Sequence, residues 1–229
     1  MDRLPSAIIK LSWKTDANGA PLTGCNVEGG LCGTAFSLSS GQILTATHHL
    51  RNLWRPKDGF DDFDVWIAHP DGTVHVVAAD AVQPFDGFDI SQVNCQGSPT
   101  VFSASTKPYD EVEVAQCIGY EANTAPFTCA VADNRVTISE VDLAKVLLPN
   151  SPQPVERGRA SINGDVVIDD KLCYVVKQPA TIGLSGGPMV DPEDGRVLAV
   201  CCFGLPPDEH KKEIIGAVDI RALPILNAC

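Results

Sequence analysis

Short strand-like runs separated by turns recur along the whole chain and constrain its fold more than any other sequence feature. The runs are rich in Val, Ile, Thr and aromatic residues, and Gly, Pro, Asn and Asp punctuate them. The 3.6-residue period of a long amphipathic helix is nearly absent, and only residues 138–148 are compatible with either a helix or a strand followed by a loop. This pattern predicts an all-β fold, either a barrel or a sandwich. The expected strands cover residues 7–13, 34–38, 42–46, 63–68, 73–78, 112–120, 188–190 and 196–200.

Two polar, turn-rich segments divide the chain. Residues 94–110 lie near its middle and are interpreted as a linker between two β units. Residues 149–159 are rich in proline and are interpreted as a mobile loop inside the second unit. A chain of 229 residues is long enough to bury a sizeable core. We therefore predict a first unit at residues 1–108 and a second at residues 109–229.

Charge and composition exclude several classes of protein. Lys and Arg number 17 against 29 Asp and Glu, so the formal net charge is −12. Neither nucleic acid nor an anionic membrane surface is expected as a partner, because contacts with phosphate need clustered basic side chains. No run approaches the roughly 20 apolar residues of a membrane span. The 44% of hydrophobic residues is too high for an intrinsically disordered chain.

The cysteines and the N-terminal residues bear on the cellular compartment. Nine cysteines are present, so at least one lies outside any intrachain disulfide. Most of them occur in apolar runs such as residues 197–203, where a reduced, buried thiol is the expected state. The first residues contain no charged segment followed by a long apolar one, so no secretory signal is recognised. A cytoplasmic location is therefore expected.

The residue types that bind metals do not form a recognisable site. The chain has no CxxC pair, and His69, His75 and His210 have no metal-ligand spacing to one another or to a cysteine. Four aspartates between residues 58 and 64 fit a solvated acidic loop better than a calcium loop, because EF-hand spacing is absent. We therefore expect no metal and no other cofactor.

Three local signals carry candidate chemistry. The strongest is residues 183–188, Gly-Leu-Ser-Gly-Gly-Pro, where a tight turn would expose the Ser185 hydroxyl and the N–H groups of Gly183 and Ser185 would face a developing oxyanion. The second is His48, at the end of an apolar strand, and the third is Asp89, set between apolar residues. Each has an ordinary structural alternative: a glycine-rich hairpin entrance, a histidine satisfied by its neighbours, and a turn aspartate.

Together the signals are more specific, because His48, Asp89 and Ser185 follow one of the few chain orders in which a catalytic triad recurs. With these residues the sequence resembles the chymotrypsin-like serine peptidases, most closely the bacterial branch that includes the high-temperature-requirement proteases. The resemblance implies two antiparallel six-stranded β-barrels with the active site in the cleft between them. The first barrel would carry the histidine and the aspartate, and the second the serine and the oxyanion hole. The matching blocks are residues 33–36, 43–48, 88–90, 183–188 and 215–220.

The resemblance implies a serine endopeptidase that acts on protein or peptide substrates through an acyl-enzyme. Ser185 would attack the peptide carbonyl, His48 would accept the proton and return it to the leaving amine, and Asp89 would orient the imidazole. The N–H groups of Gly183 and Ser185 would stabilise the tetrahedral oxyanion.

Two departures from the family pattern are informative. Secreted members carry a cysteine after the catalytic histidine, and it pairs with the position matched here by Cys32, but this chain has His49 there. The missing partner supports a reduced, intracellular protein. His49 is also a rival for His48 as the base, but the family block favours His48. Leu184 replaces the aspartate that pairs with a newly cut N-terminus in zymogen-type members, so activation by N-terminal cleavage is not expected.

The resemblance also places the substrate pocket. Pro179, six residues before the nucleophile, would lie at the base of the primary pocket. Cys202, Phe203 and Gly204 would form its wall. Neither part contains an acid or a histidine, so a preference for Arg, Lys or Glu is unsupported. We expect a small or medium apolar side chain before the cleaved bond.

Two other functions stay open at this point. One is a catalytically silent binding module that keeps the fold. The other is a regulated effector whose peptidase stays inactive until a partner protein orders the cleft, a hypothesis motivated by the missing signal and the absent zymogen aspartate. A regulatory protein partner is therefore a further expectation.

Overall fold

The structure is a computed structural model of the 229-residue chain. Its regular structure is almost entirely β, as the strand pattern predicts. Among the residues that it describes, the one α-helix is the single turn α1 (Thr47–Arg51). The described residues are 3–22, 24, 26–39, 42–51, 56–95, 100–148, 150–158, 161–162, 166–167, 173–177, 181–205 and 214–223.

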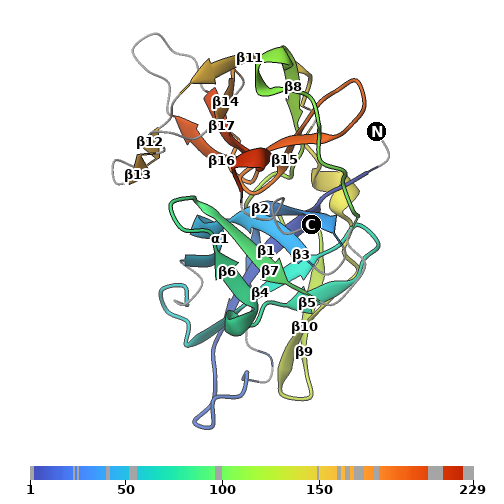
Figure 1. Cartoon of the computed structure of the whole chain (residues 1–229). Coiled ribbons are helices and arrows are strands. Elements are labelled where there is room, and N and C mark those ends of the chain that lie inside the picture. Colours follow the sequence, from blue (N-terminus) through green and yellow to red (C-terminus); the bar gives the residue numbers. More distant parts are fainter. Residues whose placement is uncertain are drawn as a thin grey trace.

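The first half of the chain forms one antiparallel seven-stranded sheet, which curls around its own core (Figure 1). The order of strands is β5-β4-β1-β2-β3-β7-β6. Its inner face packs Ile8, Ile43, Ile67 and Val93 together. The strands are β1 (Ser6–Trp13), β2 (Glu28–Ser39), β3 (Gln42–Ala46), β4 (Asp62–Ala68), β5 (Val74–Val76), β6 (Val82–Pro84) and β7 (Ile90–Asn94).

This sheet is not the closed six-stranded barrel that the resemblance implies. The edge strands β5 and β6 do not pair with each other, and residues 77–81, including the 3₁₀ turn η2 (Ala79–Ala81), connect them. Both edge strands are short, and Pro84 in β6 has no N–H to donate to a neighbour. The sheet therefore curls toward closure without completing the ladder.

The second half contains a closed six-stranded barrel, as predicted for this unit. Around the barrel the order is β11-β14-β17-β16-β15-β8, and β8 pairs with β11 to close it. Tyr174, Met189, Leu198 and Ala217 are completely or almost completely buried inside it. The strands are β8 (Val114–Cys117), β11 (Gln153–Gly158), β14 (Cys173–Val176), β15 (Pro188–Val190), β16 (Val197–Leu205) and β17 (Ile214–Asp219).

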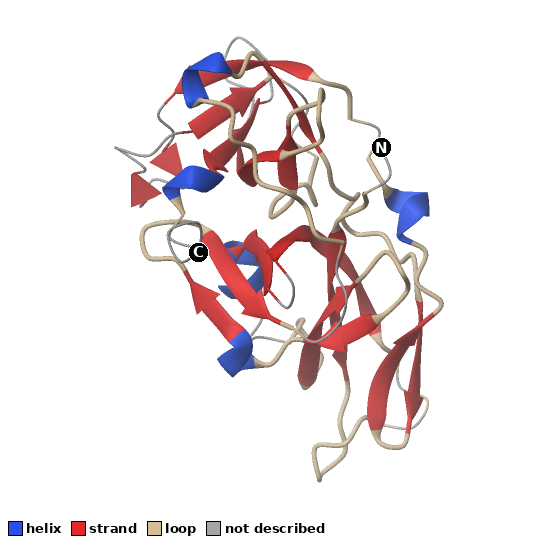
Figure 2. Ribbon diagram, turned by 45° about the vertical axis from the view of Figure 1, so that its right-hand side comes forward, coloured by secondary structure: helices blue, strands red, loops and turns tan. Residues whose placement is uncertain are grey.

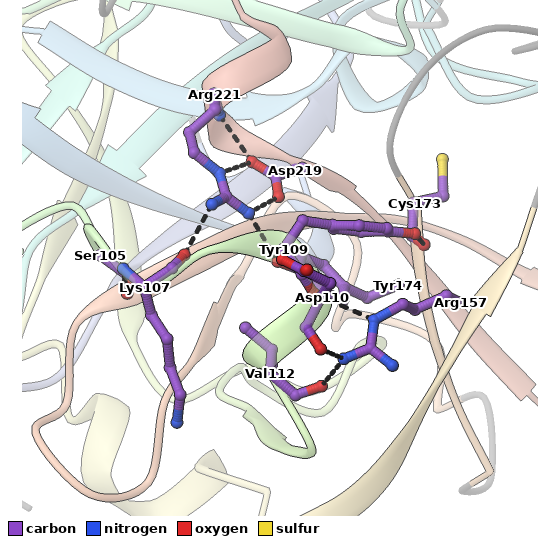
Figure 3. A network of polar contacts seen from close by, with 10 residues as sticks. All are labelled: Ser105, Lys107, Tyr109, Asp110, Val112, Arg157, Cys173, Tyr174, Asp219 and Arg221. Carbon is purple, nitrogen blue, oxygen red and sulfur yellow. Dashed lines mark hydrogen bonds and ion pairs between the residues drawn. The ribbon is translucent and has the colours of Figure 1, made fainter.

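The interpretation of residues 149–159 as a mobile loop is wrong for their described part, because β11 is a strand of the barrel. Val155 packs against the barrel core. Arg157 donates to the carbonyl oxygens of Tyr109, Asp110 and Val112 at 3.0, 2.6 and 2.6 Å (Figure 3). Side-chain anchoring thus overrides the local preference of a proline-rich segment for a loop.

An additional hairpin projects from the second half and packs on the first. Strands β9 (Thr128–Ala132) and β10 (Arg135–Ser139) pair only with each other. The inward residues Val136 and Ile138 pack in one cluster with Trp13 and Trp66. Residues 138–148 are neither one helix nor one strand: they end β10 and then form the 3₁₀ turn η4 (Leu143–Val146). A further pair, β12 (Ser161–Ile162) and β13 (Val166–Val167), forms a separate small sheet.

The two halves share an apolar core, so they form one continuous unit. Figure 2 shows their strands as two neighbouring groups. Phe36 and Phe88 of the first half lie in the same cluster as Val200 and Cys202 of the barrel. Phe102, from the connecting segment, packs edge-on against Phe36 with ring centroids 5.9 Å apart. The two halves are therefore held in a fixed relative position.

The connecting segment is hydrogen-bonded to both halves. Phe102 N–H donates to Ser37 at 2.8 Å, and Ser105 N–H donates to Val197 at 2.7 Å. Farther along, Arg221 donates to the carbonyl oxygen of Lys107 at 2.6 Å and forms an ion pair with the buried Asp219 (Figure 3). The boundary predicted between residues 108 and 109 falls just before the 3₁₀ turn η3 (Tyr109–Glu111) and stays a prediction.

The seven cysteines within the described ranges are free thiols, and four of them are buried; Cys25 and Cys229 lie outside those ranges. No helix in the described part of the chain has the length and apolar character to cross a membrane.

Candidate active site

The helical turn that carries His48 is held against the strand that follows Asp89. Thr47 N–H donates to the Asp89 carbonyl oxygen at 3.0 Å, and the Thr47 and Ser91 hydroxyl groups lie 2.8 Å apart. Both threonine and serine are buried. These contacts connect α1 to the start of β7, so the side chains of His48 and Asp89 leave neighbouring pieces of backbone.

His48 and Asp89 form a close pair. His48 Nδ1 lies 2.5 Å from Asp89 Oδ2, and the His48 backbone N–H donates to Asp89 Oδ1 at 3.0 Å. Because a carboxylate oxygen accepts, Nδ1 carries the proton in the neutral imidazole and Nε2 keeps its lone pair. The side chain of His48 is 38% exposed, whereas that of Asp89 is only 8% exposed. The arrangement leaves a basic nitrogen at the surface, oriented by a buried carboxylate.

The predicted nucleophile turn, residues 183–187, depends on two glycines. Gly183 and Gly186 have φ values of +111° and +81°, which side chains other than glycine rarely adopt. A Cβ at residue 183 would lie 2.3 Å from the carbonyl oxygen of Tyr120, and one at residue 186 would lie 2.1 Å from that of Thr34. The chain can therefore make this turn, and present Ser185 at its tip, only with glycine at both positions.

The carbonyl groups of the turn are fixed by neighbouring elements. Thr34 Oγ1 donates to the Gly183 carbonyl at 2.6 Å, and Thr34 N–H donates to that of Ser185 at 3.0 Å. Ala122 N–H donates to the Ile182 carbonyl at 2.9 Å. Since the C=O and N–H of a trans peptide point in opposite directions, the Gly183 N–H faces away from Ala122.

Three backbone N–H groups of the turn donate hydrogen bonds in the described part of the structure, and two do not. Those of Leu184, Gly186 and Gly187 donate to carbonyl oxygens at 3.3, 2.6 and 2.9 Å. Within the described ranges, the N–H groups of Gly183 and Ser185 have no acceptor. These are the two donors that the sequence predicts for an oxyanion hole, and both are available to a negatively charged oxygen.

His49 contacts both His48 and the predicted nucleophile turn. Its ring centroid is 4.2 Å from that of His48, and its Nε2 is 3.2 Å from the carbonyl oxygen of Ser185. No hydrogen bond joins His48 Nε2 to Ser185 Oγ in the described part of the structure. In ligand-free enzymes such bonds are often long and tighten only when substrate binds. His48 and Ser185 thus both contact one shared neighbour, His49.

The residues predicted to bind substrate have mixed outcomes. Cys202 is 2% exposed, and its thiol donates to the Val200 carbonyl within the core between the two halves, so its side chain lines no open pocket. Burial, and to a lesser extent the nearby Asp89 charge, raises the pKa of this thiol. Phe203 and Gly204 lie on β16 with their backbones paired to β17. Pro179 lies outside the described residues.

Thr34 and Ile182 were not singled out from the sequence as contributors to the site, and His49 was considered only as an alternative base. Thr34 and His49 fix carbonyl groups of the turn, and Ile182, which directly precedes Gly183, is 71% exposed. The signal for Thr34 was its place in the Gly33–Phe36 block, where a polar residue interrupts an apolar strand. The signal for Ile182 was weaker, because exposure of an apolar side chain cannot be read from sequence.

The other histidines do not join the site. His69 Nδ1 lies 2.8 Å from the Ser6 hydroxyl group, and the His69 ring lies 5.4 Å from that of His75, on the sheet of the first half. His210 lies outside the described residues. In the part of the chain that is described, no three His, Cys, Asp or Glu side chains converge as a metal site would require.

Solved structures of serine proteases have the same fold. The HtrA-type protease AlgW, solved with a decapeptide, aligns with a TM-score of 0.59 and 13% sequence identity over 96% of this chain and 62% of the AlgW chain. The active form of the Rv3671c protease from M. tuberculosis aligns with a TM-score of 0.55 and 18% identity, covering 96% of this chain and 80% of its own. A second AlgW structure, solved with a tripeptide, aligns with a TM-score of 0.56 and 14% sequence identity.

These comparisons establish the fold, and they confirm the predicted likeness to trypsin-fold proteases of the HtrA type at the level of structure. The chain spans less than two thirds of the length of AlgW. No protein-family model matches the sequence, and no curated protein matches it.

Proposed function

We propose that the protein is a serine endopeptidase in which Ser185, His48 and Asp89 form a catalytic triad. The observation that carries this proposal is the His48–Asp89 pair, placed next to a glycine turn whose two alternate N–H groups lack acceptors among the described residues. A structural histidine or an ordinary hairpin would explain one of these features but not both together.

The proposed chemistry follows from the tautomer of His48. Asp89 accepts from Nδ1, so Nε2 is free to take the Ser185 proton as Oγ attacks a peptide carbonyl. The imidazolium that forms is stabilised by the carboxylate and then protonates the leaving amine. The acyl-enzyme on Ser185 is hydrolysed by water in a second, equivalent step.

The oxyanion hole would need no cleavage of the chain to form. Leu184, which stands in place of an ion-pairing aspartate, is 2% exposed and packs in the barrel core. The buried Leu184 side chain anchors the turn in the barrel core. Ala122 and Thr34 fix the carbonyl groups of the two preceding residues, Ile182 and Gly183. Loss of one oxyanion donor typically raises the barrier by about 3 kcal/mol.

The proposed substrate is a protein or peptide with a small or medium apolar side chain before the cleaved bond. AlgW is solved with bound peptides, which supports a peptide ligand for this fold. The exposed Ile182 offers an apolar contact beside the oxyanion turn. The cytoplasmic location and the regulatory partner remain proposals.

Labelling with a fluorophosphonate tests the proposal, because only an activated serine reacts with this probe. We expect one label per chain, mapped by mass spectrometry to the peptide that contains Ser185. Ser185→Ala should abolish labelling at an unchanged Tm, whereas Ser103→Ala, at an exposed serine of the connecting segment, should not affect it. A folded wild-type protein that binds peptide but takes no label would instead be a silent binding module.

A further inference from the structure

His49 is a histidine that the proposed chemistry does not use, although it lies within the site. It follows His48 in α1, and the two rings lie against each other at 54° with centroids 4.2 Å apart. The partly exposed ring of His48 is therefore in contact with both Asp89 and His49.

His49 also contacts the nucleophile turn. Its Nε2 lies 3.2 Å from the Ser185 carbonyl oxygen. A carbonyl oxygen only accepts, so Nε2 carries the proton. Burial, followed by the charge of His48, lowers the pKa of His49 to about 3. His49 therefore stays neutral near pH 7, and the hydrogen bond keeps one direction.

Gly33 makes room for this ring. A Cβ built on Gly33 would lie 2.4 Å from His49 Cδ2 and Nε2 and 2.8 Å from Cε1, and these are its three nearest atoms. The strand β2 passes directly under the imidazole, so any side chain at residue 33 would displace it. The position of His49 is thus specified by the strand below as well as by its two partners.

We propose that His49 is a positioning residue that joins the base to the nucleophile, its ring supporting His48 and its Nε2–H holding the Ser185 carbonyl. This inference rests on the proposed peptidase function. Its role differs from that of the triad, because His49 transfers no proton in the proposed chemistry. Small displacements of reacting groups are costly, since an error of about 1 Å can lower a rate about 100-fold.

Two substitutions separate the donor from the ring. His49→Phe keeps an aromatic ring against His48 but removes the donor, and we expect the rate of fluorophosphonate labelling and the kcat for a peptide substrate to fall about 10- to 100-fold, with KM nearly unchanged. His49→Gln removes the ring but can place an amide N–H near the same carbonyl, so we expect it to lose activity, by about threefold, but less than His49→Phe does. Equal activity in His49→Phe and wild type would overturn the proposal. So would His49→Gln falling as far as His49→Phe.

Gly33→Ala provides a second test, because it displaces a chemically intact His49. We expect it to lower the labelling rate to a similar extent, and we expect the double variant Gly33→Ala/His49→Ala to be no worse than His49→Ala alone, since no ring remains for the added Cβ to displace. Additive losses would contradict this coupling.

The proposal and the peptidase function fail in different ways. An unlabelled wild-type protein would remove both, whereas a labelled wild type with unaffected variants would remove only the role of His49. Should His49→Phe not fold, ¹⁵N spectra of the wild-type imidazoles decide: a neutral His49 protonated at Nε2 at pH 7 supports the proposal, and one protonated at Nδ1 overturns it.

Discussion

The carboxylate of Asp89 accepts two hydrogen bonds from one residue, His48: Oδ1 from the backbone N–H at 3.0 Å and Oδ2 from Nδ1 at 2.5 Å. The pair of bonds fixes the position of the backbone as well as the ring. It also satisfies a carboxylate that is almost completely buried, whose desolvation would otherwise be costly. The ring of His48 is therefore held in a single tautomer.

Asp89→Asn should separate geometry from tautomer. The amide can still accept from the backbone N–H, but its NH₂ group favours the His48 tautomer with the proton on Nε2, which cannot act as a base. We expect kcat to fall by about four orders of magnitude, as is typical of this substitution in triads, with little change in Tm.

Asp86→Asn, at an exposed aspartate of the same loop, is the matched control and should leave kcat unchanged. If Asp89→Asn kept full activity, Asp89 would have no part in orienting His48.

Thr34→Val should weaken both the fold and the nucleophile turn. The change removes the hydroxyl group that donates to the Gly183 carbonyl at 2.6 Å and accepts from Tyr120 N–H at 3.2 Å, so two buried polar groups lose a partner. We expect the free energy of unfolding to decrease by about 2 kcal/mol, measured by urea denaturation, together with slower labelling of Ser185.

The control for this prediction is Thr137→Val, at an exposed threonine of β10, which should change the free energy of unfolding by less than about 0.5 kcal/mol. If the free energy of unfolding decreased equally in the two variants, the buried hydrogen bonds of Thr34 would contribute no more to stability than an exposed one.

The partly buried His49 should make the protein sensitive to acid. Its pKa is about 3 in the folded state, against an ordinary value of 6.5, so the unfolded chain binds a proton that the folded chain rejects. The associated stability is complete above pH 6.5 and is lost as the pH falls toward 3. Between pH 7.5 and 4.5 we expect His49→Gln to lose about 2 kcal/mol less stability than wild type. If urea denaturation showed the same loss of stability in His49→Gln and in wild type over this pH range, a partly buried, neutral His49 would be contradicted.

Asp64 should have the opposite effect on the pH dependence of stability. Burial, and then the nearby Asp62, raises its pKa to about 6 from 3.8, so the folded state favours the protonated form. Its contribution to stability is present below pH 3.8 and is lost as the pH rises through 6. We expect Asp64→Asn to increase the free energy of unfolding at pH 7.5 by about 1 kcal/mol, after allowance for solvent screening, and to have no effect near pH 3.5.

Asp71→Asn, in contrast to Asp64→Asn, should lower the free energy of unfolding at pH 7.5. Hydrogen bonds from the Thr73 hydroxyl group and backbone lower the pKa of Asp71, so the folded state favours its charged form and the substitution should destabilise the protein. A gain in stability in both variants would point to net charge rather than to the local environment of Asp64.

The architecture was predictable where strands are amphipathic and turns carry glycine. The hairpin β2–β3 and the tight turn at Gly183 and Gly186 follow from local preferences visible in the sequence, whereas the closing strand β17 was expected only from the family resemblance of residues 215–220. The strand β11 was missed, because its proline-rich sequence favours a loop and only the contacts of Val155 and Arg157 hold it in the barrel. Closure of the first sheet was also predicted wrongly, since hydrogen bonding between two short edges depends on how far the whole sheet curls.

By itself the sequence determined the β character of the chain and the glycines that its nucleophile turn requires, because periodicity and backbone conformation are local properties. Only the tertiary structure decided which of two adjacent histidines pairs with Asp89 and which holds the Ser185 carbonyl. His49 and Ser185 are 136 positions apart, and Thr34 and Gly183 are 149 apart. Contacts over such distances arise from the packing of two β units around one core, and no local preference encodes them.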